Sequence, residues 1–155
     1  MISLLLMAGT GAAPTNKSLE GTWTLVAADV THADGSRGRD YGESPKGLLV
    51  IDAAGRYSLQ IYKSERPKFA AGEKAKGTPV EFQSAVMGMS AHFGRIEVGA
   101  QDNTLTFKIE TASFPNWEGT DKVCPGFEFK GEEFSYQSPK RPNGDTPISI
   151  WRRAK

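Results

Sequence analysis

The stretch Gly21-Thr22-Trp23-Thr24-Leu25 opens the first β-patterned run of this chain, and Trp151-Arg152-Arg153 closes the last one. A tryptophan that enters the first strand can fill the narrow end of a small β-barrel, and a guanidinium of the last strand can stack on its indole. Because alternate residues of a strand share a face, Arg152 is expected inside, together with the isoleucines of its strand. The sequence therefore predicts a barrel that Trp23 and Arg152 seal at one end and that is open at the other.

Length and charge limit the class of protein. The chain has 155 residues and a mass of 16.8 kDa, which fits one domain. Its 19 Lys and Arg residues nearly cancel its 18 Asp and Glu residues, and the formal net charge is +1. Nucleic-acid binding depends on neutralising phosphates with basic side chains, and this chain has no such excess. We therefore do not expect a nucleic acid as its partner.

The first residues differ in composition from the rest. Residues 1–13 are apolar and then small, as in a secretory signal peptide with its cleavage region. We expect a signal peptide here, which predicts a periplasmic or secreted protein; the alternative is an N-terminal arm. No other run approaches the roughly 20 apolar residues of a transmembrane span.

The remainder of the chain alternates apolar and polar residues with period two, interrupted by turn residues. This pattern is typical of an antiparallel β-meander. We expect an all-β fold, an eight-stranded up-and-down barrel over residues 19–153. The predicted strands cover residues 23–30, 47–51, 56–62, 93–98, 104–110, 123–129, 133–137 and 148–153.

One short helix is expected around residues 79–90. Thr78, Pro79 and Glu81 form a capping box with proline at the first helical position. Phe82, Val86 and Met89 would follow as one apolar stripe, so the helix either plugs one end of the barrel or covers a ligand as a lid. Before it, residues 63–76 hold five basic and two acidic side chains. That loop is either solvated surface or attracts an anionic ligand to the barrel mouth.

Strand parity predicts an interior with few polar groups on apolar walls, which is the usual form of a small-molecule pocket. His92 is the main candidate for acid–base chemistry, with Asp29 as a partner if the two come within hydrogen-bonding distance. The alternative is a structural histidine. The candidate ligand-binding residues are Asp29, Tyr57, His92, Phe107, Trp117 and Tyr136.

Two further features have alternative interpretations. The segment 113–119 is either a loop folded over the barrel rim or an aromatic wall of the mouth, with Trp117 stacking on a ring-bearing ligand. Cys124 is the only cysteine, so no intrachain disulfide can form, and we expect a small buried residue rather than a catalytic thiol. Cys and His show no metal-site spacing, and we predict neither a metal nor a cofactor.

Taken in order along the chain, several segments resemble the bacterial and fungal lipocalin-like domain family of small calycin-type barrels. The resemblance implies an eight-stranded barrel and a site for a hydrophobic ligand, and it implies no particular reaction. The resembling segments are Leu19–Trp23, Tyr41–Gly42, Pro45–Leu49, Gly55–Ile61, Arg66–Phe69, Ala91–Gly94, Phe114–Gly119 and Trp151–Arg153.

These observations favour a non-catalytic binding or carrier protein for a small apolar or aromatic molecule in the barrel lumen. Two alternatives remain open. One is an isomerase or cyclase that uses His92 as acid–base in the lumen. The other is a structural domain whose barrel is filled by its own side chains.

Overall fold

Ten strands and one α-helix make up the fold in the computed structural model, which describes residues 12–155. The predicted signal peptide falls almost entirely on residues 1–11, outside the described part. The strands are β1 (Gly21–Thr31), β2 (Arg37–Gly38), β3 (Lys46–Ile51), β4 (Arg56–Tyr62), β5 (Met89–Val98), β6 (Leu105–Ala112), β7 (Asp121–Cys124), β8 (Glu128–Phe129), β9 (Glu133–Gln137) and β10 (Thr146–Arg153). The helices are α1 (Pro79–Met87) and the 3-10 turns η1 (Asn16–Leu19), η2 (Lys74–Lys76) and η3 (Pro115–Trp117).

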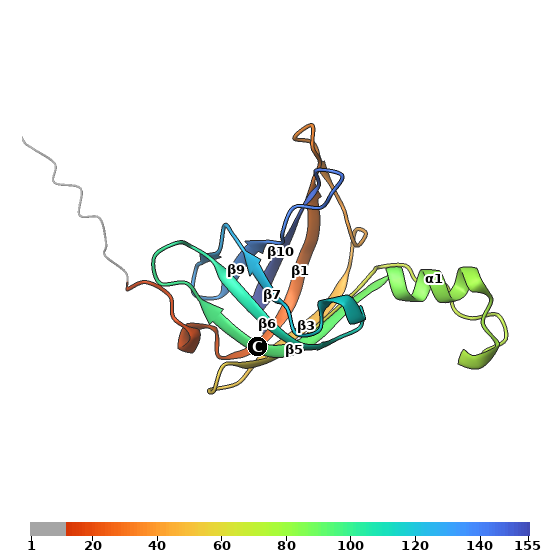
Figure 1. Ribbon diagram of the computed structural model, residues 1–155, viewed down its shortest axis with the longest axis horizontal. Coiled ribbons are helices and arrows are strands. Elements are labelled where there is room, and N and C mark those ends of the chain that lie inside the picture. Colours follow the sequence, from red (N-terminus) through yellow and green to blue (C-terminus); the bar gives the residue numbers. More distant parts are fainter. Residues whose placement is uncertain (1–11) are drawn as a thin grey trace, which may run out of the picture.

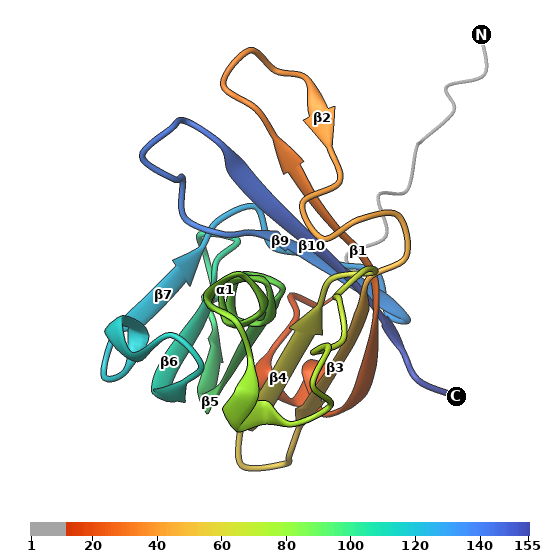
Figure 2. The same cartoon turned by 90° about the vertical axis from the view of Figure 1, so that its right-hand side faces the viewer.

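All strand pairs are antiparallel and form one curled sheet in the order β7-β6-β5-β4-β3-β1-β10-β9-β8, with β2 paired to β1 (Figures 1 and 2). The prediction of an all-β fold with an up-and-down strand order is confirmed, although the structure has ten strands instead of eight. The short β2 accounts for one difference. The other arises because Pro125 and Gly126, whose φ is +64°, interrupt the expected strand 123–129 and divide it into β7 and β8.

The two edge strands of the sheet are consecutive in the chain, and the segment between them closes one end of the barrel. The Phe127 N–H donates to the Asn103 carbonyl at 2.8 Å, and the Gln137 N–H donates to the Pro125 carbonyl at 2.9 Å. These bonds join the β6 side of the sheet to the β9 side. At the other end, the start of β7 and the segment after β9 leave a seam between the edges.

An arginine and a tryptophan seal the closed end, but the arginine is not the predicted one. The guanidinium that lies over the Trp23 ring, 4.2 Å from its centroid, belongs to Arg153. It also donates to the carbonyls of Glu20 at 2.9 Å and Ser18 at 3.0 Å. The Trp23 indole N–H donates to the Leu19 carbonyl at 2.8 Å, so hydrogen bonds hold both side chains of the seal.

The prediction of Arg152 was wrong because the parity of β10 is set by its tryptophan. Trp151 is fully buried, so Ser149 and Arg153, two residues away on either side, share the inward face. Arg152 points outward, is exposed, and pairs with Glu133 at 3.0 Å. The two isoleucines of β10 are only half-buried, and a register shift separates Leu25 from Ala27 in the facing strand.

The helix forms where predicted, although it ends three residues early. Thr78 and Glu81 make the expected capping box, with the Thr78 N–H donating to the Glu81 carboxylate at 2.7 Å. Gly88 follows as the C-cap, and Met89 already belongs to β5.

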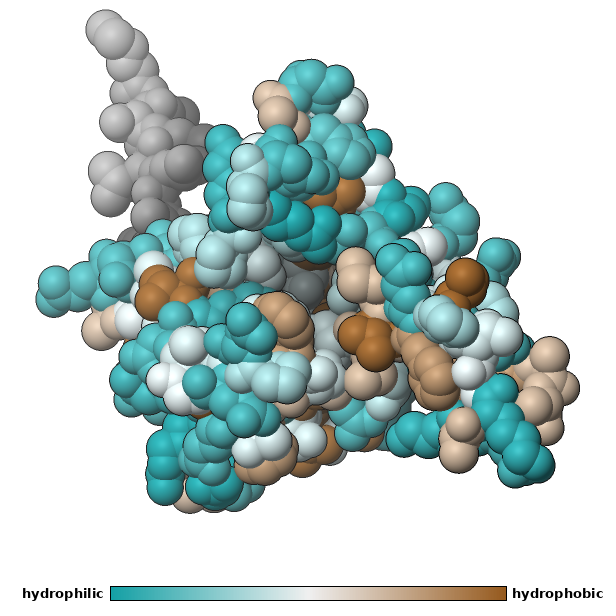
Figure 3. All heavy atoms as spheres, turned by 45° about the vertical axis from the view of Figure 1, so that its right-hand side comes forward, coloured by the Kyte–Doolittle hydropathy of each residue, from teal (hydrophilic) through white to brown (hydrophobic). Residues whose placement is uncertain are grey.

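Neither the plug nor the lid interpretation of this helix holds. α1 projects away from the barrel on an arm between β4 and β5, and its residues do not line the cavity described below (Figure 1). Apolar side chains gather on this side of an otherwise largely hydrophilic surface, where Val80 and Met87 are 70% and 67% exposed (Figure 3). Within residues 12–155, no helix has the length and apolarity needed to span a bilayer.

The core fills the closed half of the barrel. Aromatic rings dominate its packing, as in the edge-on contact of Trp23 with Phe134, whose ring centroids are 4.6 Å apart. Fully buried members include Trp23, Leu49, Ile51, Ile96, Leu105, Phe107, Phe134 and Trp151.

Candidate functional site

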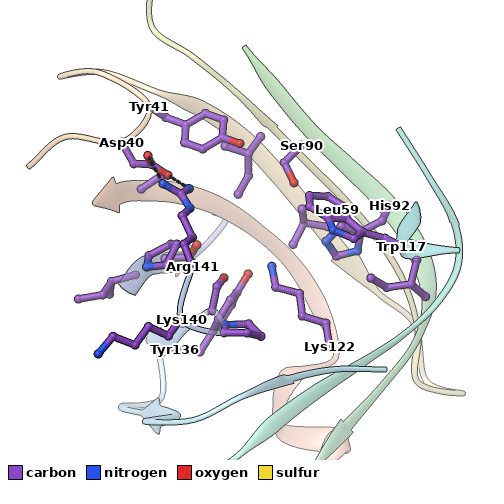
Figure 4. A pocket seen from close by; sticks show the side chains of 18 of the residues that line it. Asp40, Tyr41, Leu59, Ser90, His92, Trp117, Lys122, Tyr136, Lys140 and Arg141 are labelled. Carbon is purple, nitrogen blue, oxygen red and sulfur yellow. Dashed lines mark hydrogen bonds and ion pairs between the residues drawn. The ribbon is translucent and has the colours of Figure 1, made fainter. Parts of the chain in front are cut away.

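A cavity of about 400 Å³ occupies the half of the barrel opposite the Trp23 seal (Figure 4). Its walls come from β1, β4, β5, β6, β7, β9, β10 and η3, and from residues 138–142, which form the rim beyond β9. Leu59, Ile61 and Ile109 supply aliphatic surface. The barrel is therefore filled at one end and hollow at the other.

Four of the six candidate ligand-binding residues line this cavity: Asp29, His92, Trp117 and Tyr136. The other two lie in a layer beneath it. The Phe107 ring packs edge-on against His92 at 5.5 Å and against Tyr136 at 5.3 Å, and Tyr57 packs on Phe107 at 5.0 Å. Tyr57 and Phe107 thus support the cavity floor without lining it.

His92 and Tyr57 are joined by a side-chain hydrogen bond. The Tyr57 hydroxyl and His92 Nδ1 are 2.8 Å apart, and the imidazole is only 4% exposed. Burial and, to a smaller extent, the charge of Lys122 together lower the pKa of His92 to about 3. Burial also raises the pKa of the Tyr57 phenol. At neutral pH both groups are uncharged, so they form a weak acid–base pair, and of the two only His92 lines the cavity, where it can hydrogen-bond a ligand.

The expected pairing of Asp29 with His92 does not form. The Asp29 carboxylate accepts a hydrogen bond from Arg39 at 3.1 Å, and the Nδ1 atom of His92 is bonded to Tyr57. Both residues line the same cavity, but each already has another partner. This removes the arrangement that an acid–base mechanism would use.

Trp117 forms part of the cavity wall, as the aromatic-wall interpretation of segment 113–119 proposed. It belongs to η3, and its ring meets His92 edge-on at 6.1 Å and Phe114 at 5.4 Å. The Thr120 hydroxyl fixes the turn by donating to the Trp117 carbonyl at 2.7 Å. Trp117 is half-buried, so part of its ring is available to a molecule in the cavity.

Lys122 is a functional candidate that sequence reasoning missed. Its side chain leaves β7 and points into the cavity between Trp117 and Tyr136 (Figure 4). Nζ lies 5.8 Å from the centroid of the Trp117 ring. Burial lowers the pKa of this amine, and the nearby charge of Arg141 lowers it further. Within residues 12–155, no carboxylate lies within 4.0 Å of Nζ.

A signal for Lys122 existed in the parity of its strand. Cys124 is fully buried, and Lys122, two residues earlier, must share its inward face. The prediction started this strand at Val123 and so omitted Lys122. An apolar residue usually marks the inward face, but Val123 is 49% exposed and points outward.

The buried Cys124 does not provide a reactive thiol to the cavity. Its side chain is fully buried and does not line the cavity. Burial raises the pKa of its thiol to about 11, so the reactive thiolate is scarce at neutral pH.

The acidic side chains that line the cavity are engaged in ion pairs. The Arg141 guanidinium donates to both carboxylate oxygens of Asp40, at 2.9 and 2.6 Å, and this bidentate pair raises the pKa of Arg141. Asp121 binds Lys108 at 3.2 Å on the outside of the barrel. Lys122 and the exposed Lys140 therefore remain as the cations of the cavity that have no acidic partner in the described part of the chain.

The chain matches a known protein family. A family model described as a lipocalin-like domain covers residues 20–153, nearly all of the described chain. No curated protein sequence shows significant similarity to it.

Proposed function

This chain belongs to the lipocalin-like domain family, and we propose that it binds a small apolar or aromatic molecule in the open half of its barrel. The observation that carries the proposal is the cavity of about 400 Å³ above the aromatic floor. Small-molecule sites usually enclose roughly 300–1,000 Å³, with apolar walls and few polar groups. A domain filled throughout by its own side chains would leave no such space.

Binding without catalysis is the function that the side chains support best. His92 is uncharged at neutral pH and its Nδ1 is engaged by Tyr57, while Asp29 is paired with Arg39. An isomerase or cyclase that relied on His92 would need a base with a pKa much closer to neutral. The same groups suit the orientation of a bound ligand by hydrogen bonds.

N-phenyl-1-naphthylamine, an uncharged aromatic fluorophore, tests this proposal directly. We expect a saturable rise in its fluorescence and a higher melting temperature of the protein, because a ligand that binds only the native state stabilises it. At a free concentration 100 times Kd the stabilisation is about 2.7 kcal/mol.

A pair of matched variants locates the binding. Ser90→Phe introduces a ring at a buried position that lines the cavity, whereas Ser58→Phe introduces the same ring on the exposed outer face of β4. We expect Ser90→Phe to weaken probe binding at least tenfold and Ser58→Phe to leave it unchanged, with folding checked by circular dichroism. Equal binding by wild type and Ser90→Phe, or no saturable binding by wild type, would contradict the proposal.

A further inference from the structure

The cavity contains a cation without a counter-ion, and we propose that its ligand supplies one. The inference, which rests on the proposed function, is that this protein selects a small amphipathic organic acid. The ring or chain of the acid would lie on the apolar wall, and its carboxylate or sulfonate would pair with Nζ of Lys122.

The first support is that the acidic side chains around the cavity are paired, whereas Lys122 is not. Asp29 is held by Arg39, Asp40 by Arg141 and Asp121 by Lys108, all at 3.2 Å or less. Lys122 is half-buried, and a charge partly withdrawn from water is favoured by a partner of opposite sign nearby. No acidic side chain in the described residues meets that need for Lys122, and an anionic ligand in the cavity would meet it.

The second support is the direction of the lysine side chain. A long side chain of this kind usually extends its amine toward bulk water. The side chain of Lys122 instead points into the cavity, where Trp117 flanks it and Tyr136 lies across from it (Figure 4). A head group beside Nζ would leave the rest of the ligand in the same cavity as the aliphatic side chains of Leu59 and Ile61.

The third support is the character of the surrounding groups. Tyr136 lines the cavity as an uncharged phenol, because burial raises its pKa. Lys140 and Arg141 add positive charge at the rim, and Asp40 neutralises only the second of them. An acid entering through this mouth meets attraction on its path and, at Nζ, a charge-assisted hydrogen bond.

Two fluorophores with the same aromatic skeleton test the inference. 8-Anilino-1-naphthalenesulfonate differs from N-phenyl-1-naphthylamine only by its sulfonate. We expect wild type at pH 7 and low salt to bind the sulfonate at least tenfold more tightly than the uncharged probe. We expect Lys122→Met, which keeps the length and apolar volume of the side chain, to abolish that preference while still binding the uncharged probe.

Lys140→Met is the matched control, because it removes an exposed lysine from the rim of the same cavity. It should reduce the preference for the sulfonate less than threefold. If wild type binds both probes equally, or if Lys122→Met keeps the preference, the inference is wrong and the proposed function stands. If wild type binds neither probe, the proposed function fails and the inference fails with it.

Discussion

His92 links the stability of this protein to pH through a single side chain. Its pKa is about 3 in the native state, against an ordinary value near 6.5, so the unfolded chain takes up the proton first. The contribution of His92 to the free energy of unfolding is therefore fully present above about pH 6.5. It decreases as the pH falls toward 3, by up to about 5 kcal/mol over the whole interval.

We expect the His92 imidazole to remain uncharged in NMR titrations down to about pH 4. In urea unfolding, His92→Gln should lose less stability between pH 7 and pH 4 than wild type does. The chain has two histidines, and His32→Gln assigns the resonances. A His92 signal that titrates near pH 6.5 would show that the imidazole is open to water.

The bond between Tyr57 and His92 gives a second prediction at the scale of the residue. Tyr57→Phe removes the hydroxyl and leaves His92 Nδ1 buried without a partner. An unsatisfied buried polar group costs about 1–3 kcal/mol, so the free energy of unfolding should fall by this amount at pH 7. Tyr62→Phe, which removes a bond of 3.0 Å to Gln60 on a half-buried residue, is the control and should cost less. Equal losses of free energy in the two variants would show that the buried Tyr57–His92 bond stabilises the protein no more than the half-buried one.

At the scale of the element, we expect Arg153 of β10 to contribute more to stability than the neighbouring Arg152. Arg153→Ala removes the stacking on Trp23 and two hydrogen bonds to backbone carbonyls near η1. We expect a loss of about 1–3 kcal/mol in urea unfolding. Arg152→Ala removes an exposed ion pair with Glu133 and should change stability by less than about 1 kcal/mol. If Arg152→Ala cost more stability than Arg153→Ala, Arg152 would be the arginine that seals the barrel, as parity first predicted.

The elements show how far sequence reasoning reached. β4 and β9 begin and end as predicted, because each alternates cleanly and is bounded by turn residues. β10 has the opposite parity, because two isoleucines outweighed the single tryptophan in the assignment. The sequence prediction omitted Lys122 for a related reason. On β7 the apolar Val123 faces solvent, whereas the charged Lys122 faces the interior. Local pattern therefore located the strands, whereas the cavity depends on packing between strands that are distant in sequence.

At the scale of the whole molecule, one half of the barrel is packed with side chains and the other half contains the cavity. The closed half buries its apolar rings, and hydrogen bonds hold the Trp23 and Arg153 side chains that seal it. The open half retains a lysine whose pKa burial lowers, which disfavours the charged form in the empty protein. A site prepared for a ligand in this way is expected to cost stability.

Lys122→Met should therefore make the unliganded protein more stable, by about 0.5–2 kcal/mol, while it loses the preference for the sulfonate probe. The native state must hold the charge of this half-buried lysine at pH values below its lowered pKa, and there the gain is largest. Between that pKa and the ordinary value of 10.5, the native lysine becomes neutral while the unfolded chain still binds the proton, so the gain shrinks as the pH rises. Urea unfolding of both proteins from pH 6 to pH 10 measures this trend, with Lys140→Met expected to change little. A Lys122→Met variant that is less stable than wild type at pH 6 would mean that the amine stabilises the wall, and the cavity would then no longer require an anion from outside.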